Sequence, residues 1–250
     1  MKKAFTLTEG RLCAFDRSAR RSMTRAGFTL AEVLITLGVI GIVAALTMPA
    51  LISNTQEKIT VVKLKKIYSV LDNAMRMAVI EHGTADNWGL SYGDANNVLE
   101  KLSPYLNINE NCGTSEAACG FYEGTYKSLS GVSGQFTGNF AVGFGKIRLN
   151  DGIPVAVWAQ PAGDSYGVLV VDINGAQKPN VSGKDAFWFY IAKDRISPTG
   201  DSVIHSFDSA CINSNDFDAG RGCTAWVIQN ENMDYLHCDG LDWNTKTKCN

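Results

Sequence analysis

A run of 20 uncharged, largely apolar residues at 33–52 constrains this 250-residue chain more than any other feature. A helix of about 20 apolar residues is long enough to cross the ~30 Å hydrocarbon core of a membrane. The alternatives are the core of a cleaved secretory signal and a buried helix of a globular domain. No small-residue cleavage site follows directly and a helical pattern continues beyond the run, so a membrane-spanning helix is favoured.

The apolar run separates regions of opposite charge. The first 27 residues contain seven basic and two acidic side chains, a net charge of +5, whereas the other 223 contain 16 basic and 23 acidic ones, a net charge of −7. Basic residues before a membrane span indicate that the N-terminus faces the cytoplasm. The overall charge of −2 and a pI near 5.9 argue against a dedicated nucleic-acid-binding protein.

Glu32 immediately precedes the apolar run. A carboxylate costs on the order of 2.5–3.5 kcal/mol at the centre of a bilayer and less near its edge, so it is normally paired. Glu32 therefore either marks the membrane edge or has a cationic partner that arrives on assembly.

The residues around Glu32 resemble the class III signal of type IV pilins and type II secretion pseudopilins. In that family a glycine precedes a phenylalanine, a glutamate follows four positions later, and an apolar helix comes next. Gly27, Phe28 and Glu32 match this pattern, and Pro49 lies 21 residues after Phe28, where many members carry a helix-kinking proline. The resemblance extends over residues 27–82.

The resemblance implies a processing and assembly mechanism. A prepilin peptidase would cut between Gly27 and Phe28 and methylate the new amine of Phe28. Glu32 would then pair with the Phe28 amine of a neighbouring subunit, since an α-amino group with a pKa of about 7.7–8 is mostly protonated at neutral pH. The region around Pro49 could become extended in the fibre. The implied partners are the peptidase, other pilin or pseudopilin subunits, an inner-membrane assembly platform and the lipid bilayer.

The basic leader, residues 1–27, is longer than the fewer than ten residues of many family leaders. Residues 1–9 look like a partial copy of the signal, with Ala4 in place of the glycine. A start at Met23 would give a five-residue leader, so both Met1 and Met23 remain open as the true start.

The helical pattern continues beyond the apolar run. Residues 53–82 contain no glycine or proline, and apolar side chains recur there at the spacing of one helix face. The predicted stripe is Leu64, Ile67, Tyr68, Leu71, Ala74, Met75 and Ala78. One helix over residues 28–82 would be roughly 80 Å long.

The remaining residues, 83–250, predict a head domain with several strands. The expected strands are 146–149, 154–158, 166–171, 186–191 and 224–228, with a further strand signal near Phe140. Asn150-Asp-Gly152 predicts a hairpin turn between the first two. Residues 83–137 look irregular apart from a short helix at 97–102. The predicted fold is α+β and pilin-like, with the long helix packed on an antiparallel sheet.

The seven cysteines divide into one and six. Cys13 lies in the leader and would be removed. An even number on the outer side of a membrane indicates disulfides, with 15 possible connectivities. A metal site is disfavoured because the chain has no C-x-x-C motif and scattered histidines. Local pairing would give Cys112–Cys119, Cys211–Cys223 and Cys238–Cys249.

A loop beginning at Asp172 is the best candidate for a small ion. Asp172, Asn174 and Asp185 offer the oxygen ligands that Ca²⁺ prefers, and some pseudopilins hold Ca²⁺ in a head-domain loop. The spacing is not that of an EF-hand, because Gly175 comes too early and no glutamate closes the loop. An Asx-rich connection between two strands is therefore favoured over a Ca²⁺ site.

Two motifs of common enzyme classes are absent from the sequence. There is no complete P-loop and no H-E-x-x-H. The resemblance implies a structural subunit of a type II secretion pseudopilus or a type IV pilus, single-pass in a bacterial inner membrane, with its head in the periplasm or in an extracellular fibre. The alternatives are a minor pilin acting as an adhesin or DNA-uptake module, which alone would bind nucleic acid, and a membrane-anchored periplasmic enzyme.

Overall fold

The fold was analysed in a computed structural model. It describes residues 27–115, 117–137, 143–201 and 205–249. Within these ranges only the backbone is described for Pro49, Ala50 and residues 134–137. The chain divides into two units between Ala50 and Leu51, and each unit is described by itself.

Several sequence-based expectations lie outside the described residues. They are the leader up to residue 26, with Cys13, the start at Met23 and the partial signal copy at 1–9, and the strand signal near Phe140.

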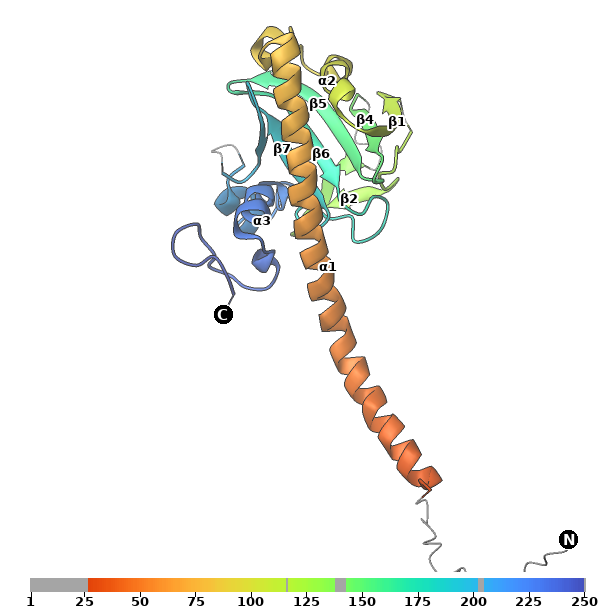
Figure 1. Cartoon of the computed structure of the whole chain (residues 1–250). Coiled ribbons are helices and arrows are strands. Elements are labelled where there is room, and N and C mark those ends of the chain that lie inside the picture. The colour runs from red at the N-terminus through yellow and green to blue at the C-terminus, as the bar shows by residue number, and fades with distance from the viewer. Residues whose placement is uncertain (1–26, 116, 138–142, 202–204, 250) are drawn as a thin grey trace, which may run out of the picture. The chain divides into compact units, whose positions relative to one another are not determined.

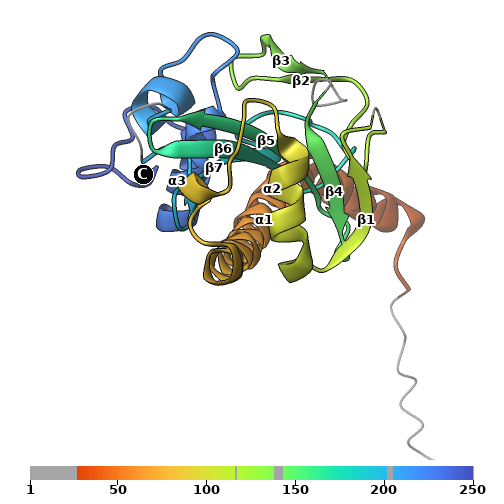
Figure 2. The same cartoon turned by 90° about the horizontal axis from the view of Figure 1, so that it is seen from above.

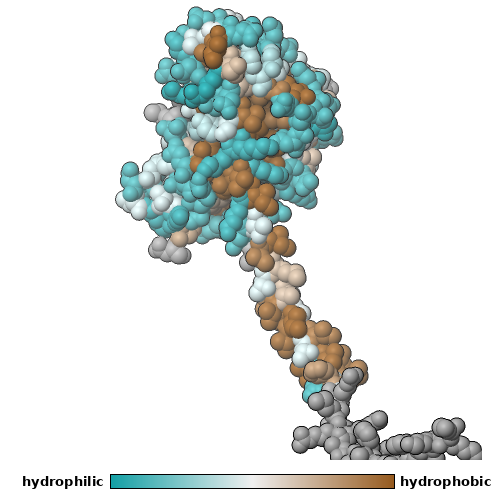
Figure 3. All heavy atoms as spheres, in the orientation of Figure 1, coloured by the Kyte–Doolittle hydropathy of each residue, from teal (hydrophilic) through white to brown (hydrophobic). Residues whose placement is uncertain are grey.

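Helix α1, Leu30–His82, is the long helix at the start of the described chain (Figure 1). Its residues in the first unit are largely apolar on all sides. It is the one described helix that is long and apolar enough to cross a membrane, with a mean hydropathy of 2.3 over its most apolar 18-residue window and none of that window buried. Figure 3 shows this part of the helix as largely hydrophobic surface. The helix begins two residues later than expected, at Leu30.

Beyond Leu51, α1 buries one apolar stripe against the head. Six of the seven stripe residues predicted from the sequence are buried, and the seventh, Tyr68, is half-buried. The Tyr68 ring stacks on Phe189, with 5.9 Å between ring centroids. The predicted amphipathic helix is therefore confirmed for this part of α1.

The head contains a six-stranded antiparallel sheet in the order β1-β4-β5-β6-β7-β8. Its strands are β1 Ile108–Gly113, β4 Gly145–Leu149, β5 Pro154–Ala162, β6 Ser165–Asp172, β7 Ala186–Ile191 and β8 Ile196–Pro198. A second, two-stranded sheet pairs β2 Thr125–Lys127 with β3 Ser133–Thr137. The α+β, pilin-like architecture predicted from the sequence is confirmed.

The large sheet is covered on both faces. Helices α1 and α2, Ala95–Leu102, lie on one face, and the small sheet lies on the other (Figure 2). Because side chains alternate along a strand, Val155 and Val157 of β5 pack toward the helices, whereas Ala156 joins an aromatic cluster on the opposite face. Burial on both faces explains why β7 is apolar or aromatic throughout, without alternation.

The segment after β8 contains little regular structure. Its longest helix is α3, Thr224–Asn230. The short 3₁₀ or π-helical turns of the head are η1 Ala85–Asn87, η2 Ser103–Tyr105, η3 Asp208–Ile212, η4 Arg221–Cys223 and η5 Asp234–Leu236.

The strand expected at 224–228 is wrong, because these residues belong to α3. Its β-branched residues favour strands, but tertiary contacts decide between the two conformations. Thr224 Oγ1 accepts the backbone N–H of Trp188 at 3.0 Å, and the side chain of Trp226 is fully buried. The segment therefore packs against β7 as a helix.

The expectation of irregular structure at 83–137 is also partly wrong. The short helix is present as α2, and Asp94 caps it by accepting the N–H of Asn97 at 3.3 Å. Strands β1, β2 and β3 were not expected. Strand β1 lies at the edge of the sheet and has no fully buried residue, so it lacks the apolar alternation of an inner strand.

The packing of α1 can be tested with two substitutions on the same helix. Leu71→Ala should lower the free energy of unfolding by about 2–5 kcal/mol, because Leu71 is only 1% exposed and its loss leaves a cavity. Ile80→Ala is the control and should change it by less than about 0.5 kcal/mol, since Ile80 is 79% exposed. Urea unfolding of the detergent-solubilised full chain measures both; equal effects would contradict the packing.

Candidate functional site

The start of α1 is built around a reciprocal pair of hydrogen bonds between Thr29 and Glu32. The N–H of Glu32 donates to Thr29 Oγ1 at 3.2 Å, and the N–H of Thr29 donates to Glu32 Oε2 at 2.8 Å. The Thr29 hydroxyl also donates to Glu32 Oε2 at 2.8 Å. This arrangement is a capping box, which satisfies backbone N–H groups that have no partner inside the helix.

The capping box gives Glu32 a further role, in helix capping, besides the two roles expected from its charge at the membrane edge. The S/T-x-x-E spacing of Thr29 and Glu32 is visible in the sequence and could have predicted it. Within the described part of the chain, Glu32 forms no ion pair, and its carboxylate contacts only Thr29. Its charge therefore remains available to a cation from outside the subunit.

The two residues that flank the expected cleavage point lie before the helix. Gly27 and Phe28 have no regular secondary structure, and both are exposed, Phe28 by 87%. A side chain added at Gly27 would meet nothing within 4 Å in the structure. The fold of this chain therefore places no constraint on Gly27, and a requirement for glycine there would have to come from a partner.

Pro49 lies within α1.

All six cysteines of the head form disulfides in the structure. Their pairs are Cys112–Cys119, Cys211–Cys223 and Cys238–Cys249, with Cα–Cα distances of 6.1, 5.0 and 5.8 Å. These distances lie in the usual range for disulfides. The pairs are local in sequence, so each one closes a short loop of the head.

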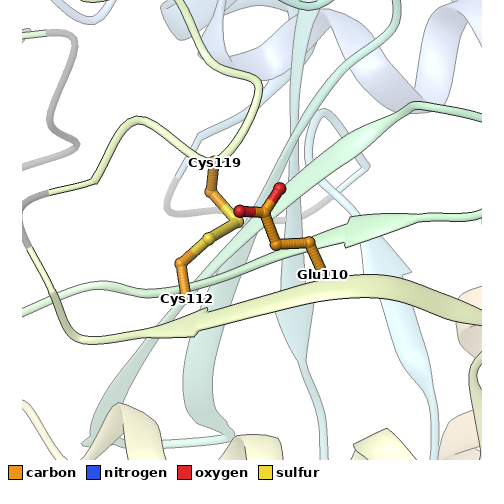
Figure 4. Close-up of side chains that lie close together, drawn as sticks. All are labelled: Glu110, Cys112 and Cys119. Carbon is orange, nitrogen blue, oxygen red and sulfur yellow. A yellow bond between two sulfur atoms is a disulfide. The ribbon is translucent and has the colours of Figure 1, made fainter.

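One cluster of potential metal ligands has another explanation. Glu110, Cys112 and Cys119 bring a carboxylate and two sulfurs within 4.8 Å of one another. Figure 4 shows that the two sulfurs are bonded to each other, so neither is a thiolate ligand. The Glu110 carboxylate forms an ion pair with Arg148. These three residues do not form a metal site.

The structure brings together the residues of the loop that was expected to bind an ion or to connect two strands. Asp172, at the end of β6, is fully buried and accepts hydrogen bonds from the Tyr126 hydroxyl and from the N–H of Asn174 at 3.2 Å. Asp185 accepts the N–H groups of Asn180 and Val181 at 2.6 and 2.7 Å. Both carboxylates thus hold the backbone of the connection between β6 and β7.

Burial dominates the electrostatics of this loop. It raises the pKa of Asp172 to about 8, and the nearby charge of Asp185 acts in the same direction. Burial also raises the pKa of Asp185. The amide oxygens of Asn174 and Asn180 are buried and accept no hydrogen bond from the described residues. The group can serve as a structural connection as it stands, and binding of Ca²⁺ by Asp172, Asn174 and Asp185 stays a prediction.

The cluster most like a set of catalytic groups surrounds His205. Its Nδ1 contacts the hydroxyl of Tyr190, and its Nε2 lies 3.9 Å from Asp218 Oδ1. Burial raises the pKa of Tyr190 to about 12 and lowers that of His205. The phenol and the imidazole are therefore both neutral at pH 7, and among the residues that the structure describes neither contacts an activated nucleophile.

In the comparison with known families, residues 22–48 match the model of the prokaryotic N-terminal methylation motif. This segment is the prepilin-type cleavage and methylation signal of type IV pilins and pseudopilins, in agreement with the resemblance noted in the sequence. No curated protein and no solved structure was found to match the chain.

The buried carboxylate of Asp172 predicts a pH-dependent stability. A pKa raised from 3.8 to about 8 means that the folded chain holds a proton that the unfolded chain releases, so the free energy of unfolding should fall as the pH rises from about 4 to about 8. Asp172→Asn should make this slope less steep, by up to about 1.4 kcal/mol per pH unit. Urea unfolding at several pH values measures the slope.

Two controls complete this experiment. Asp164→Asn, at an exposed position, should leave the slope unchanged, and an equal change in both variants would contradict the assignment to Asp172. Repeating the series with Ca²⁺ and with a chelator tests the ion. Bound Ca²⁺ would raise the free energy of unfolding of the wild-type protein but not of Asp172→Asn.

Proposed function

We propose that this chain is a structural pilin-like subunit that is cut by a prepilin peptidase and assembled into a pseudopilus or pilus. The observation that carries the proposal is the methylation signal at 22–48, placed at the start of a 53-residue helix. The first part of that helix is exposed and apolar, and its second part packs on the head. The same chain can therefore have an apolar stem in lipid or fibre and a folded head in water.

The local conformation at Gly27 and Phe28 suits proteolysis. A peptidase must bind the scissile bond in an accessible, non-helical segment, and these residues are exposed and precede the first turn of α1. Cleavage would convert the backbone nitrogen of Phe28 into an amine. The capping box lies on the retained side of the cut, so the helix start would survive processing.

Glu32 supplies the negative charge that assembly requires. In the proposed fibre its carboxylate pairs with the amine of Phe28 in a neighbouring subunit. An unpaired carboxylate in an apolar setting has an unfavourable desolvation free energy. An added subunit removes this cost only when its position along the fibre brings the Phe28 amine to Glu32. Glu32 thereby contributes more to the specificity of assembly than to the stability of a single subunit.

The membrane arrangement follows from charge and from the disulfides. The leader carries a net charge of +5, which favours retention in the cytoplasm. The head carries three disulfides, which form and persist in oxidising compartments such as the periplasm. We infer a single-pass subunit of the inner membrane with its head in the periplasm, whose partners include the peptidase, other subunits and an assembly platform.

The signal is shared by pseudopilins of type II secretion systems and by type IV pilins, and both assemblies fit the proposal. Cell fractionation distinguishes them, because a pseudopilus remains with the envelope whereas a pilus subunit appears in sheared surface fibres. N-terminal mass spectrometry of the native protein tests the whole proposal: a mature chain beginning with N-methylated Phe28 is expected, and an intact leader would refute it.

Replacing Gly27 should block processing. Gly27→Val adds a branched side chain next to the proposed scissile bond, so uncut precursor should accumulate in the membrane and the N-methylated form should be lost. Gly38→Val is the matched control, because Gly38 lies within α1 and a side chain added there also meets nothing within 4 Å. Immunoblotting and mass spectrometry measure both forms. Normal maturation of Gly27→Val would refute the cleavage assignment.

Removing the charge of Glu32 should leave cleavage intact and impair assembly. Glu32→Gln is the informative change, since glutamine can still complete the capping box. We expect correctly cut protein but a yield of assembled fibre lower by roughly tenfold or more, because an ion pair in an apolar setting is lost. Thr29→Val, which removes the box but keeps the carboxylate, should reduce the yield less. Wild-type fibre yield for Glu32→Gln would exclude the pairing.

A further inference from the structure

Five exposed residues form a patch on α1 where the helix enters the head. They share the side of the helix that faces away from the sheet, and we call them the lysine patch: Lys58, Ile59, Val62, Lys63 and Lys66. Val62 is 68% exposed and Ile59 49%. The patch therefore combines positive charge with accessible apolar surface, and Figure 3 views the head from this side.

The positive charge of the patch is only partly balanced within the subunit. Lys66 pairs with Asp151 at 3.0 Å. Lys58 and Lys63 form no ion pair with any residue that the structure describes. Glu57, the acid on α1 next to the patch, instead contacts His237 of the head at 2.9 Å.

A groove adjoins the patch. It is lined by Lys58, Val61, Val62, Lys65 and Glu231, with a volume of about 500 Å³. Lys65 and Glu231 form an ion pair across it, which links α1 to the segment after α3. The apolar wall of Val61 and Val62 gives a docking partner a surface to bury beside the charges.

The rest of the head has the opposite charge. Residues 83–250 contain 11 basic and 19 acidic side chains, a net charge of −8. Several exposed carboxylates form no ion pair among the described residues, namely those of Glu123, Asp164, Asp208 and Asp239. One copy of this chain thus has a basic patch on its helix and a head of net negative charge with exposed, unpaired carboxylates, so charge favours a contact between two copies.

We propose that the lysine patch receives exposed carboxylates on the head of a second copy of this chain. The inference rests on the proposed function, because it describes how neighbouring heads contact each other in the fibre. Two different surfaces meet in such a contact, so it is heterologous, and repeating it produces an open helical assembly. The contact would set the spacing of the heads, while the apolar stems pack separately.

The size of the patch limits how strongly it can bind. Residues 58–66 span roughly 12 Å along a helix whose outer face is about 10 Å wide. The patch therefore offers a few hundred Å² at most, below the ≈ 800 Å² per partner of a standard stable interface. The contact is weak alone and adds up only when the stems hold the subunits side by side, so the test requires the full chain in its native membrane.

Photo-cross-linking tests the partner directly. A benzophenone amino acid in place of Val62 should cross-link two copies that carry different tags, giving a product of twice the subunit mass. Mass spectrometry of the product should identify a peptide from the acidic part of the other head. Cross-linking only to lipid, only within one copy or only to a different protein would overturn the proposal.

Charge reversal tests the electrostatics. The double variant Lys58→Glu, Lys63→Glu should lower the cross-linking yield by roughly three- to tenfold, since two exposed ion pairs are replaced by repulsion. The matched control is Lys178→Glu, Lys184→Glu, which makes the same change in net charge at exposed positions elsewhere on the head. Substituting lysine for the acids of the cross-linked peptide in the second copy should restore the yield. Equal yields for the two double variants would overturn the proposal.

The cross-linking strains also separate the failure of this proposal from that of the proposed function. If Phe28 is methylated and the chain assembles, but the reversal variant cross-links like its control, only the lysine patch is excluded. If the leader remains attached to the wild-type protein, the proposed function fails and this inference fails with it.

Discussion

The structure depends on a single helix that must satisfy two different environments. Over its first part α1 is apolar on every side, and beyond Leu51 it has one buried stripe and an outer surface that is mostly polar, with a few exposed apolar residues. The stripe contributes to the stability of the head by burial of apolar surface. It covers one face of a sheet whose strands are rich in valine, isoleucine and phenylalanine. Without α1 most of that face would be exposed to water, so the core on this side of the sheet is incomplete until the helix packs on it.

The segment after β8 is held by other means. It contains few regular elements, and two of the three disulfides lie within it. Its aromatic residues form a compact cluster in which Phe207 stacks on Trp226 at 4.0 Å between ring centroids. An ion pair between Glu231 and Lys65 and a contact of His237 with Glu57 then connect it to α1. A small aromatic cluster with covalent links thus replaces the strands that the rest of the head uses.

Features specified by local sequence were predictable, and features specified by tertiary contacts were not. The stripe from Leu64 to Ala78 and the turn at Gly152, with its positive φ of 85°, follow from helical spacing and from the conformational freedom of glycine. Residues 224–228 show the opposite case, because their strand-like composition is overridden by burial of Trp226 and by the bond to Trp188. The exposed edge strand β1 gave no apolar pattern to detect.

The candidate site also contains features set by local sequence and features set by tertiary contacts. Gly27, Phe28 and Glu32 are recognisable because they lie in a linear motif, which the family model matches at residues 22–48. The hydrogen bonds of Asp172 and Asp185 depend on how a loop closes. The sequence showed these carboxylates and favoured a strand connection over an ion site, but it did not identify the N–H and hydroxyl groups that they accept.

The position of the first turn of α1 has a thermodynamic consequence for the proposed maturation. Aligned peptide dipoles place partial positive charge at the N-terminus of a helix, so a cation there is unfavourable. Cutting before Phe28 would create that cation two residues from Leu30, where the helix begins. The mature subunit would thus be at a higher electrostatic free energy than its precursor until a carboxylate from another subunit approaches the amine. Proteolysis would in this way store part of the driving force for polymerisation in the helix itself.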